Sequence, residues 1–473
     1  MRRSVCLATL FLAALTSCTV GPKYKRPVAT APDKYYTETA PKSESIADLA
    51  WWEIFKDPVL QGLIQEALKN NYDVRIAATR VEEAREQANV TRSQYFPQVG
   101  YAASITGARS NLIRNDTYYA YNFNLSWELD LWGRIRRLNE QQKALFFASQ
   151  EVQRGVWLSL VSDVAQAYFE LRALDEQLQI AKETGQAFQE TYDLFNKKLQ
   201  GGDATALETS RAEAALADVV AQIPNLEQQI TAKENQINLL LGRNPNPIPR
   251  GAVLSAQYDP NEVPAGLPSS LMERRPDIRQ NEQQLVASNA AIGVAKANFF
   301  PVVSLTSLFG GISPQFSQLL NSGKQWSVGG GLAGPLFTGG RLKAEYKVAV
   351  AQRNEADLIY RQNVTTAFGE VSSALAAHEK LAQSVTQEER SVSAYREAVR
   401  LSTMRYVNGL SSYFEVVDAQ LQLFPAQNTL VLFDLQRKVS LVNLYKALGG
   451  GWKLSDTDWM RTVVSASPAT SNP

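Results

Sequence analysis

The sequence contains few of the side chains that bind metals or act as catalytic bases and nucleophiles. Among its 473 residues are one histidine, two cysteines and four methionines. A His paired with a Cys or Ser nucleophile is therefore not expected, and neither is a dedicated metal site. The histidine, His378, falls on a helical stripe with Leu375, Ala382 and Val385, which indicates a structural helix contact or a pH-sensitive one.

An excess of one charge is also missing. Lys and Arg number 48 against 47 Asp and Glu, which gives a formal net charge of +1. No global basic field exists to attract nucleic acid, so a nucleic-acid partner is not expected. Beyond the first 17 residues, no run of 18 uninterrupted apolar residues occurs, so the mature chain should have no transmembrane helix.

The first 17 residues have the layout of an export signal. Arg2 and Arg3 precede an apolar run over residues 5–15, and the segment ends in Leu-Thr-Ser before Cys18. This ending resembles a bacterial lipobox, so we expect residues 1–17 to be removed and Cys18 to carry a covalent lipid such as palmitate. Thr19 follows in place of the Asp that commonly retains such lipoproteins at the inner membrane, which indicates the outer membrane. Residues 18–50 are predicted to form an extended tether, and residues 461–473 a disordered tail.

Two copies of one pattern organise the rest of the chain. The segment 93–99 matches 297–303, Arg134 corresponds to Arg341, and Gly202 corresponds to Gly409. The last two pairs are both 207 positions apart. We therefore predict a first repeat over residues 51–259 and a second over 260–460, each built of a helix, two strands and a long helical hairpin.

The first long helix is predicted from heptad-like apolar spacing and from the absence of proline over residues 134–199, and residues 341–406 repeat that length. Helices are expected over residues 57–94, 134–199, 204–241, 341–406 and 411–448. Those of about 66 residues would each span roughly 100 Å, far longer than helices in a globular core. Pro224 and Pro425 should kink or break the two returning helices.

The strands are predicted from alternation and length. Residues 119–129 alternate strictly between apolar and polar side chains, and residues 302–312 and 326–336 are similar in length. One such strand alone would fit a soluble sandwich, but the pattern appears in both copies at the length that crosses a bilayer. Four strands cannot close a barrel, so the chain must oligomerise. Two copies would supply eight strands and three would supply twelve, and strand counting leaves both open.

The motifs in this order resemble the TolC-like outer-membrane efflux proteins, in particular their NodT/OprM-like lipoprotein branch. The matching segments are Cys18 with 21–27, 51–52, 57–58, 95–97, 127–134, 274–278 and 299–301. The resemblance implies a mainly α fold with a membrane β-barrel, in which a homotrimer forms a 12-stranded β-barrel continued by a 12-helix α-barrel. It also implies a passive exit duct, without chemistry or cofactor of its own, for drugs or other toxic small molecules. Its partners would be a periplasmic adaptor protein and an inner-membrane pump of the resistance-nodulation-division (RND) type.

The same resemblance assigns roles to the hairpin tips. Arg405, Tyr406, Glu415 and Asp418 are candidates for a periplasmic gate, with ordinary solvated charges beside a turn as the alternative. The predicted adaptor contacts are Gly201, Gly202, Asn408 and Gly409. A periplasmic coiled-coil scaffold lipoprotein without a pore is the alternative for the whole chain.

Overall fold

The computed structural model describes residues 19–28, 31–35, 45–108, 116–260, 263–266, 268–321 and 323–451. Contacts divide the chain into two compact units. The described residues within 1–29, 78–152 and 277–363 form what we term the sheet unit, and those within 30–77, 153–276 and 364–473 form the hairpin unit. Each unit takes segments from both predicted repeats, so the repeats are not the compact units.

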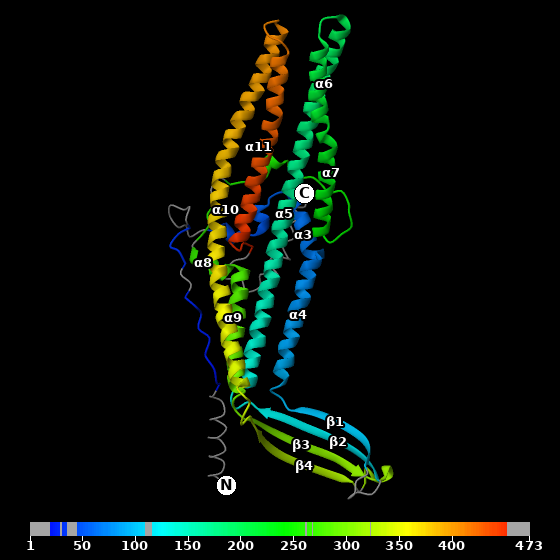
Figure 1. Ribbon diagram of the computed structural model, residues 1–473, viewed down its shortest axis with the longest axis vertical. Helices are drawn as coiled ribbons and strands as arrows, with labels where there is room; N and C mark the ends of the chain where they lie inside the picture. The colour runs from blue at the N-terminus through cyan, green and yellow to red at the C-terminus, as the bar shows by residue number, and fades with distance from the viewer. Residues whose placement is uncertain are drawn as a thin grey trace, which may run out of the picture. The chain divides into compact units, whose positions relative to one another are not determined.

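Long helices dominate the described chain (Figure 1). In chain order the helices are η1 (Ile46–Asp48), α2 (Trp51–Ile54), α3 (Pro58–Asn70), α4 (Tyr72–Ser93), α5 (Arg134–Gly201), α6 (Ala206–Val220), α7 (Gln222–Leu240), η2 (Leu254–Ala256), α8 (Pro268–Arg274), α9 (Pro276–Ala297), η3 (Phe316–Gln318), α10 (Arg341–Val407) and α11 (Phe414–Ala447). The predicted 66-residue helices are confirmed at nearly the same bounds, with 68 residues in α5 and 67 in α10.

The sheet unit contains one antiparallel sheet in the order β1-β2-β3-β4. Its strands are β1 (Gln98–Ala108), β2 (Asp116–Leu129), β3 (Val302–Ser313) and β4 (Lys324–Ala333), which lie side by side in Figure 1. The sequence placed the last strand at 326–336. It ends earlier, ahead of Pro335, because proline lacks the N–H that a strand ladder needs.

One face of this sheet carries an aromatic row that crosses all four strands. Tyr101 pairs with Phe123, Phe123 with Phe309, and Phe309 with Trp326. Directly opposed residues of antiparallel strands share a face, so the four rings lie in one row. Their exposed fractions in the single chain are 83%, 52%, 55% and 76%. The sheet therefore presents a large aromatic surface that nothing in the described chain covers.

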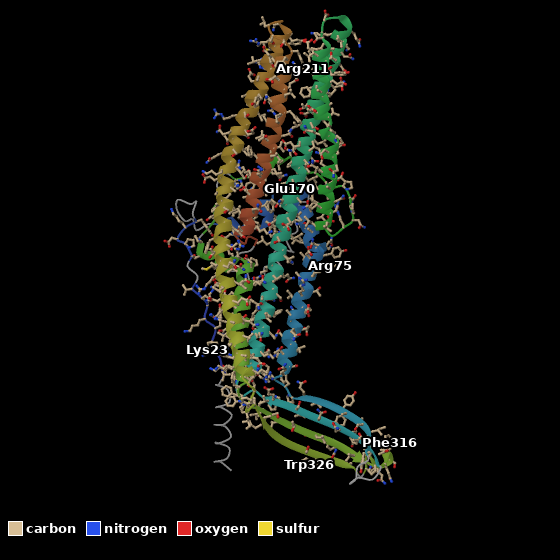
Figure 2. All side chains as sticks on the ribbon, viewed as in Figure 1. Lys23, Arg75, Glu170, Arg211, Phe316 and Trp326 are labelled. Atoms are coloured by element: carbon tan, nitrogen blue, oxygen red, sulfur yellow. The ribbon has the colours of Figure 1, made fainter. Side chains whose placement is uncertain are left out.

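Phe316, just beyond the end of β3, extends this aromatic surface to the strand ends. Its ring meets that of Tyr119 edge to face at 5.5 Å between centroids, and Figure 2 shows it with Trp326 among the side chains of the sheet. Aromatic side chains at the strand ends are typical of sheets that cross a membrane interface.

Two predicted helices are each broken in two, for different reasons. Asn71 separates α3 from α4, because its side-chain Oδ1 accepts the backbone N–H groups of Asp73 and Val74 and so begins a new helix. Ala221 separates α6 from α7. Pro224, three residues later, thus falls in the first turn of α7, where a helix tolerates proline. Pro425, by contrast, lies inside α11, which runs unbroken from Phe414 to Ala447.

The core of the hairpin unit lies between the paired helices, where α5 runs beside α6 and α7, and α10 beside α11 (Figure 1). Phe188 of α5 packs with Ala215 and Val219 of α6, and Val417 and Phe424 of α11 cover that cluster. The heptad-like spacing of α5 thus buries one stripe of the helix against its neighbours.

A buried carboxylate joins distant segments of the hairpin unit. Asp57 caps α3 by accepting the N–H of Val59 at 2.9 Å. Its other oxygen accepts the Tyr168 hydroxyl at 3.1 Å, the N–H of Ala252 at 3.1 Å and the Gln257 side-chain amide at 2.7 Å. These four donors hold the chain before α3, the middle of α5 and the segment that follows α7 together.

Candidate functional site at the hairpin tips and the sheet base

Two glycine turns form the tips of the hairpins. After α5, Gly202 adopts a φ of +84°, and after α10, Gly409 adopts a φ of +70°. At each tip the residue after glycine donates its N–H to a carbonyl five residues back, Asp203 to Lys198 and Leu410 to Arg405. A Cβ at either glycine would meet nothing within 4 Å, so the backbone conformation and not space requires glycine. The predicted contact residues Gly201, Gly202, Asn408 and Gly409 thus lie in or directly beside these turns.

The two tips contact one another through an aromatic cluster. The Tyr413 hydroxyl lies 2.6 Å from Thr191 Oγ1, and the Tyr413 ring is 4.9 Å from Phe195 and 4.8 Å from Tyr406. Lys198 places its ammonium against the Tyr406 hydroxyl and ring. Burial raises the pKa of the Tyr413 hydroxyl, and Tyr406 adds to the effect. The phenol therefore stays neutral and hydrogen bonded near neutral pH.

The structure brings together part of the predicted gate set. Arg405 Nε lies 3.3 Å from Glu415 Oε2, and both side chains are about half exposed, at 56% and 46%. Tyr406 belongs to the aromatic cluster, while Asp418 is exposed one turn along α11 from Glu415. Sequence reasoning missed Tyr413 and Thr191. The available signal was the aromatic spacing Phe188, Tyr192, Phe195, which marked the face of α5 that receives Tyr413.

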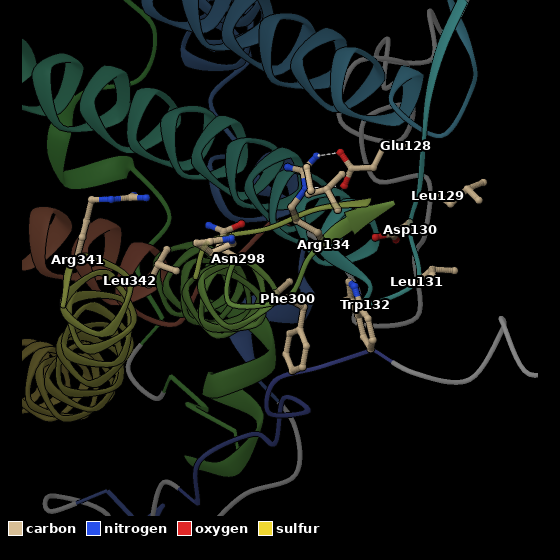
Figure 3. A pocket seen from close by; sticks show the side chains of 14 residues that line it. Glu128, Leu129, Asp130, Leu131, Trp132, Arg134, Asn298, Phe300, Arg341 and Leu342 are labelled. Atoms are coloured by element: carbon tan, nitrogen blue, oxygen red, sulfur yellow. Dashed lines mark hydrogen bonds and ion pairs between the residues drawn. The ribbon is translucent and has the colours of Figure 1, made fainter. Parts of the chain in front are cut away.

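At the base of the sheet, the segment 127–134 makes the corner from β2 to α5 (Figure 3). Arg134 donates two hydrogen bonds to Glu128, at 2.8 and 2.7 Å. Asp130 accepts the backbone N–H groups of Ile135 and Arg136, both at 2.9 Å, and so begins α5. Trp132 stacks on Phe300 with centroids 4.7 Å apart and donates its indole N–H to the Pro301 carbonyl. A cavity of about 260 Å³ lies among these residues, with Asn298, Arg341 and Leu342 on its other side.

The segment that begins the described chain, from Thr19 onward, is bound to this corner. Val20 donates its N–H to the Trp132 carbonyl, and Arg137 donates to the carbonyls of Val20 and Gly21. A Cβ on Gly21 would lie 2.5 Å from the Gly293 backbone, so α9 approaches too closely for any other residue. Further along, Arg26 pairs with Glu282 at 2.9 Å. Cys18 itself lies outside the described residues, and its lipidation stays a prediction.

None of the helices in the described chain combines the length and the apolar character needed to cross a membrane. No group of three or more His, Cys, Asp or Glu side chains in the described ranges is arranged to hold a metal ion.

Comparison with known proteins assigns the family. The model of the family described as "Outer membrane efflux protein" matches residues 63–243 and 267–450. The chain is 34% identical to the probable outer membrane lipoprotein SilC of Salmonella typhimurium, with 94% of this chain and 98% of SilC covered. It is 33% identical to the cation efflux system protein CusC of Escherichia coli, with 93% and 97% covered. The crystal structure of the open state of the Neisseria gonorrhoeae MtrE outer membrane channel superimposes with a TM-score of 0.85, at 32% identity, covering 92% of this chain and 99% of MtrE. The chain belongs to the outer membrane efflux protein family.

Proposed function

We propose that the chain assembles as a homotrimer whose twelve strands, four per chain, close one barrel in the outer membrane. The observation that carries this proposal is the open four-stranded sheet with its uncovered aromatic row. Its edge strands, β1 and β4, have no further partner strand in the described chain. A bilayer does not tolerate unpaired strand edges, and closed barrels start at about eight strands. Two copies would supply eight strands and three would supply twelve, and either number could close both edges; the twelve-helix tube that the family resemblance implies favours three copies.

The proposed activity is that of a passive exit duct for drugs or other toxic small molecules. The duct would receive its cargo from an inner-membrane RND-type pump through a periplasmic adaptor. Two relatives support this role by name, since CusC is a component of a cation efflux system and MtrE is an outer membrane channel. The two tips, 201–203 and 408–410, would contact the adaptor, and Arg405, Tyr406, Glu415 and Asp418 would line a periplasmic gate.

Lipidation at Cys18 and the division into repeats at 51–259 and 260–460 belong to the same proposal. A relative named as a probable lipoprotein, SilC, supports the lipid. The family match falls in two stretches, 63–243 and 267–450, with one inside each proposed repeat.

The trimer is tested by disulfide scanning between the edge strands. Ser104 in β1 is replaced by Cys and combined in turn with Cys at Gln325, Ser327 or Gly329 in β4, all on the face opposite the aromatic row. Oxidation of outer membranes should give a covalent species of three chains for at least one pair. Each single Cys variant is the control and should stay monomeric on a denaturing gel. Dimers as the largest product of every pair would contradict the trimer.

The duct is tested at the tips in living cells. Cysteines at the exposed positions Asp203 and Asn408, which leave the positive-φ glycines in place, are crosslinked, and the partners are identified by mass spectrometry. An adaptor should be captured from both positions and not from Cys at the exposed Lys69 on α3. Deleting the gene for this chain should also make cells more sensitive to the compounds exported by the pump that works with the captured adaptor. Unchanged sensitivity with no adaptor captured would favour the scaffold alternative.

A further inference from the structure

Three lysines gather where two helices of the sheet unit meet the sheet. Lys296 lies in the last turn of α9, and Lys343 and Lys347 lie one turn apart near the start of α10. The Phe299 ring, just after α9, meets the Tyr346 ring of α10 edge to face at 6.4 Å between centroids. Phe299 also donates its backbone N–H to the Lys296 carbonyl, and Tyr346 is next to Lys347 in the chain. We call these three lysines and two rings the basal patch.

No carboxylate within the described residues neutralises the basal patch. The three lysine side chains are exposed, and none of them forms an ion pair with another described residue. The one carboxylate in the first turns of α10, Glu345, pairs instead with Arg341 at 2.7 Å. The patch therefore keeps three positive charges that the described chain does not balance.

Helix stability does not explain these charges. Lys343 and Lys347 are four residues apart on α10, and like charges at this spacing repel one another. Basic side chains near the start of a helix also oppose its dipole, which favours carboxylates there. The two lysines thus destabilise the helix that carries them, and an anion from outside the described chain would offset that cost.

An apolar border lies between the basal patch and the sheet. Leu336 and Phe337, between β4 and α10, are 105% and 91% exposed, and Phe299 of the patch is 43% exposed. β3 begins at Val302, three residues after Phe299, so at most about 10 Å of chain separates the patch from the strand. In Figure 1, α9 ends and α10 begins at this base of the sheet. Lysines beside exposed aromatic and aliphatic side chains are typical of a surface that meets lipid headgroups.

We propose that the basal patch binds the headgroup of an anionic phospholipid. The three ammonium groups neutralise the charge of the headgroup, and the acyl chains run along Leu336 and Phe337 toward the sheet. The proposal rests on the proposed barrel, which brings the base of the sheet to the membrane surface, and adds a ligand class and a site. Carboxylates of a neighbouring copy are the rival partner, but they would leave the apolar border unexplained.

Lipid binding is measured by native mass spectrometry of the full chain in a non-ionic detergent. The protein is titrated with phosphatidylglycerol or with phosphatidylcholine of the same acyl chains, so that the two lipids differ in net charge. We expect phosphatidylglycerol to bind more tightly. Lys343→Gln with Lys347→Gln should weaken its binding about fivefold for each charge removed and should leave the affinity for phosphatidylcholine unchanged. Lys69→Gln with Lys197→Gln, at two exposed lysines of the hairpin unit, should change neither affinity.

Two further variants separate charge from apolar contact. Lys343→Arg with Lys347→Arg keeps both charges and should keep the preference for phosphatidylglycerol. Phe299→Ala should lower the affinities for both lipids by the same factor, because the ring contacts the part of the molecule that the two lipids share.

Equal affinities for the two lipids in the unaltered chain would overturn the proposal, and so would a preference that survives Lys343→Gln with Lys347→Gln. Loss of the trimer in this variant, with lipid preference unchanged, would assign the lysines to a neighbouring copy instead. The disulfides between Ser104→Cys in β1 and the cysteines in β4 test the barrel separately. If these disulfides form while the lipid preference is absent, the basal patch proposal fails and the barrel stands.

Discussion

At the scale of single residues, Asp57 shows how a charge is kept inside the hairpin unit without a cation beside it in the described chain. Four neutral donors from three segments surround the carboxylate, which is 5% exposed. Hydrogen bonds to an ionised group are the stronger kind, so the site is stable only while all the donors stay in place. Its geometry therefore has little tolerance for extra volume.

Gly251→Ala tests that tolerance. The new Cβ would lie 2.2 Å from Asp57 Oδ1, and the four hydrogen bonds prevent the carboxylate from moving aside. We expect a loss of about 1–3 kcal/mol in the free energy of unfolding, as for other overpacked cores. Gly62→Ala in α3, where a Cβ meets nothing within 4 Å, should instead stabilise by roughly 0.5–1 kcal/mol. Urea unfolding followed by circular dichroism compares the two, and an unchanged midpoint for Gly251→Ala would contradict the packing argument.

Tyr168 makes the same site sensitive to alkali. Burial raises the pKa of its hydroxyl to about 12, with the Asp57 carboxylate as a further cause. A group whose pKa is raised on folding stabilises the fold fully below its unfolded pKa of about 10 and loses that contribution as pH rises toward 12. Unfolding midpoints should therefore decline between pH 10 and 12. Tyr168→Phe should be less stable at pH 8, because the Gly251 N–H loses its acceptor, and should show a shallower alkaline decline. Parallel slopes would count against Tyr168 as the source.

At the scale of elements, much of the architecture could be predicted from the sequence, because long periodic helices and alternating strands leave strong patterns. The break at Asn71 could not, since a side-chain cap inside an apolar helical pattern gives no signal in periodicity. The bond between Thr191 and Tyr413 also escaped, because these residues are 222 positions apart and only packing of the hairpins brings them together. The proximity of Arg405 and Glu415 followed from the turn between them, since both lie within a few residues of Gly409.

The prolines of the returning helices give an element-scale prediction. Pro425 lies inside α11 and cannot donate to the carbonyl of Leu421, whereas Pro224 lies in the first turn of α7, where no intrahelical acceptor exists. Pro425→Ala should therefore stabilise the chain by about 1–3 kcal/mol in thermal unfolding. Pro224→Ala is the matched control and should change little. Equal effects of the two substitutions would show that position within the helix is not the cause.

The ion pair of Arg405 and Glu415, which we propose to line the gate, gives a second prediction at this scale. An exposed ion pair contributes only about 0.2–1 kcal/mol, so Arg405→Glu should hardly change stability. In an assembled trimer the same change repeats three times around the axis and leaves like charges opposed to Glu415. Conductance in planar bilayers should therefore rise for Arg405→Glu and return toward the original value in the swapped pair Arg405→Glu with Glu415→Arg. A swap that conducts like the single variant would show that the pair does not hold the tips closed.

At the scale of the whole molecule, the two faces of the sheet carry different side chains. Val328 shares a face with Trp326 of the aromatic row, while Ser327 points to the opposite face. If the aromatic face meets lipid, Val328→Lys should cost about 2–4 kcal/mol per chain near the bilayer centre. We expect much less heat-resistant trimer in outer membranes for Val328→Lys than for Ser327→Lys. The reverse order would show that lipid contacts the face of Ser327 and not the aromatic face.

Family membership already favours a channel over the pore-less scaffold that the sequence left open.

The near-equal lengths of α5 and α10 limit how such a chain can change in evolution. The two helices differ by a single residue, and their far ends meet where Lys198 contacts Tyr406. Removing residues from one helix would displace its tip by 1.5 Å per residue and turn its apolar stripe by 100°. Shorter or longer versions must therefore arise by matched insertions or deletions in both halves, made in steps of about seven residues. A change in the length of the chain across the periplasm therefore requires two genetic events, one in each half, and not a single event.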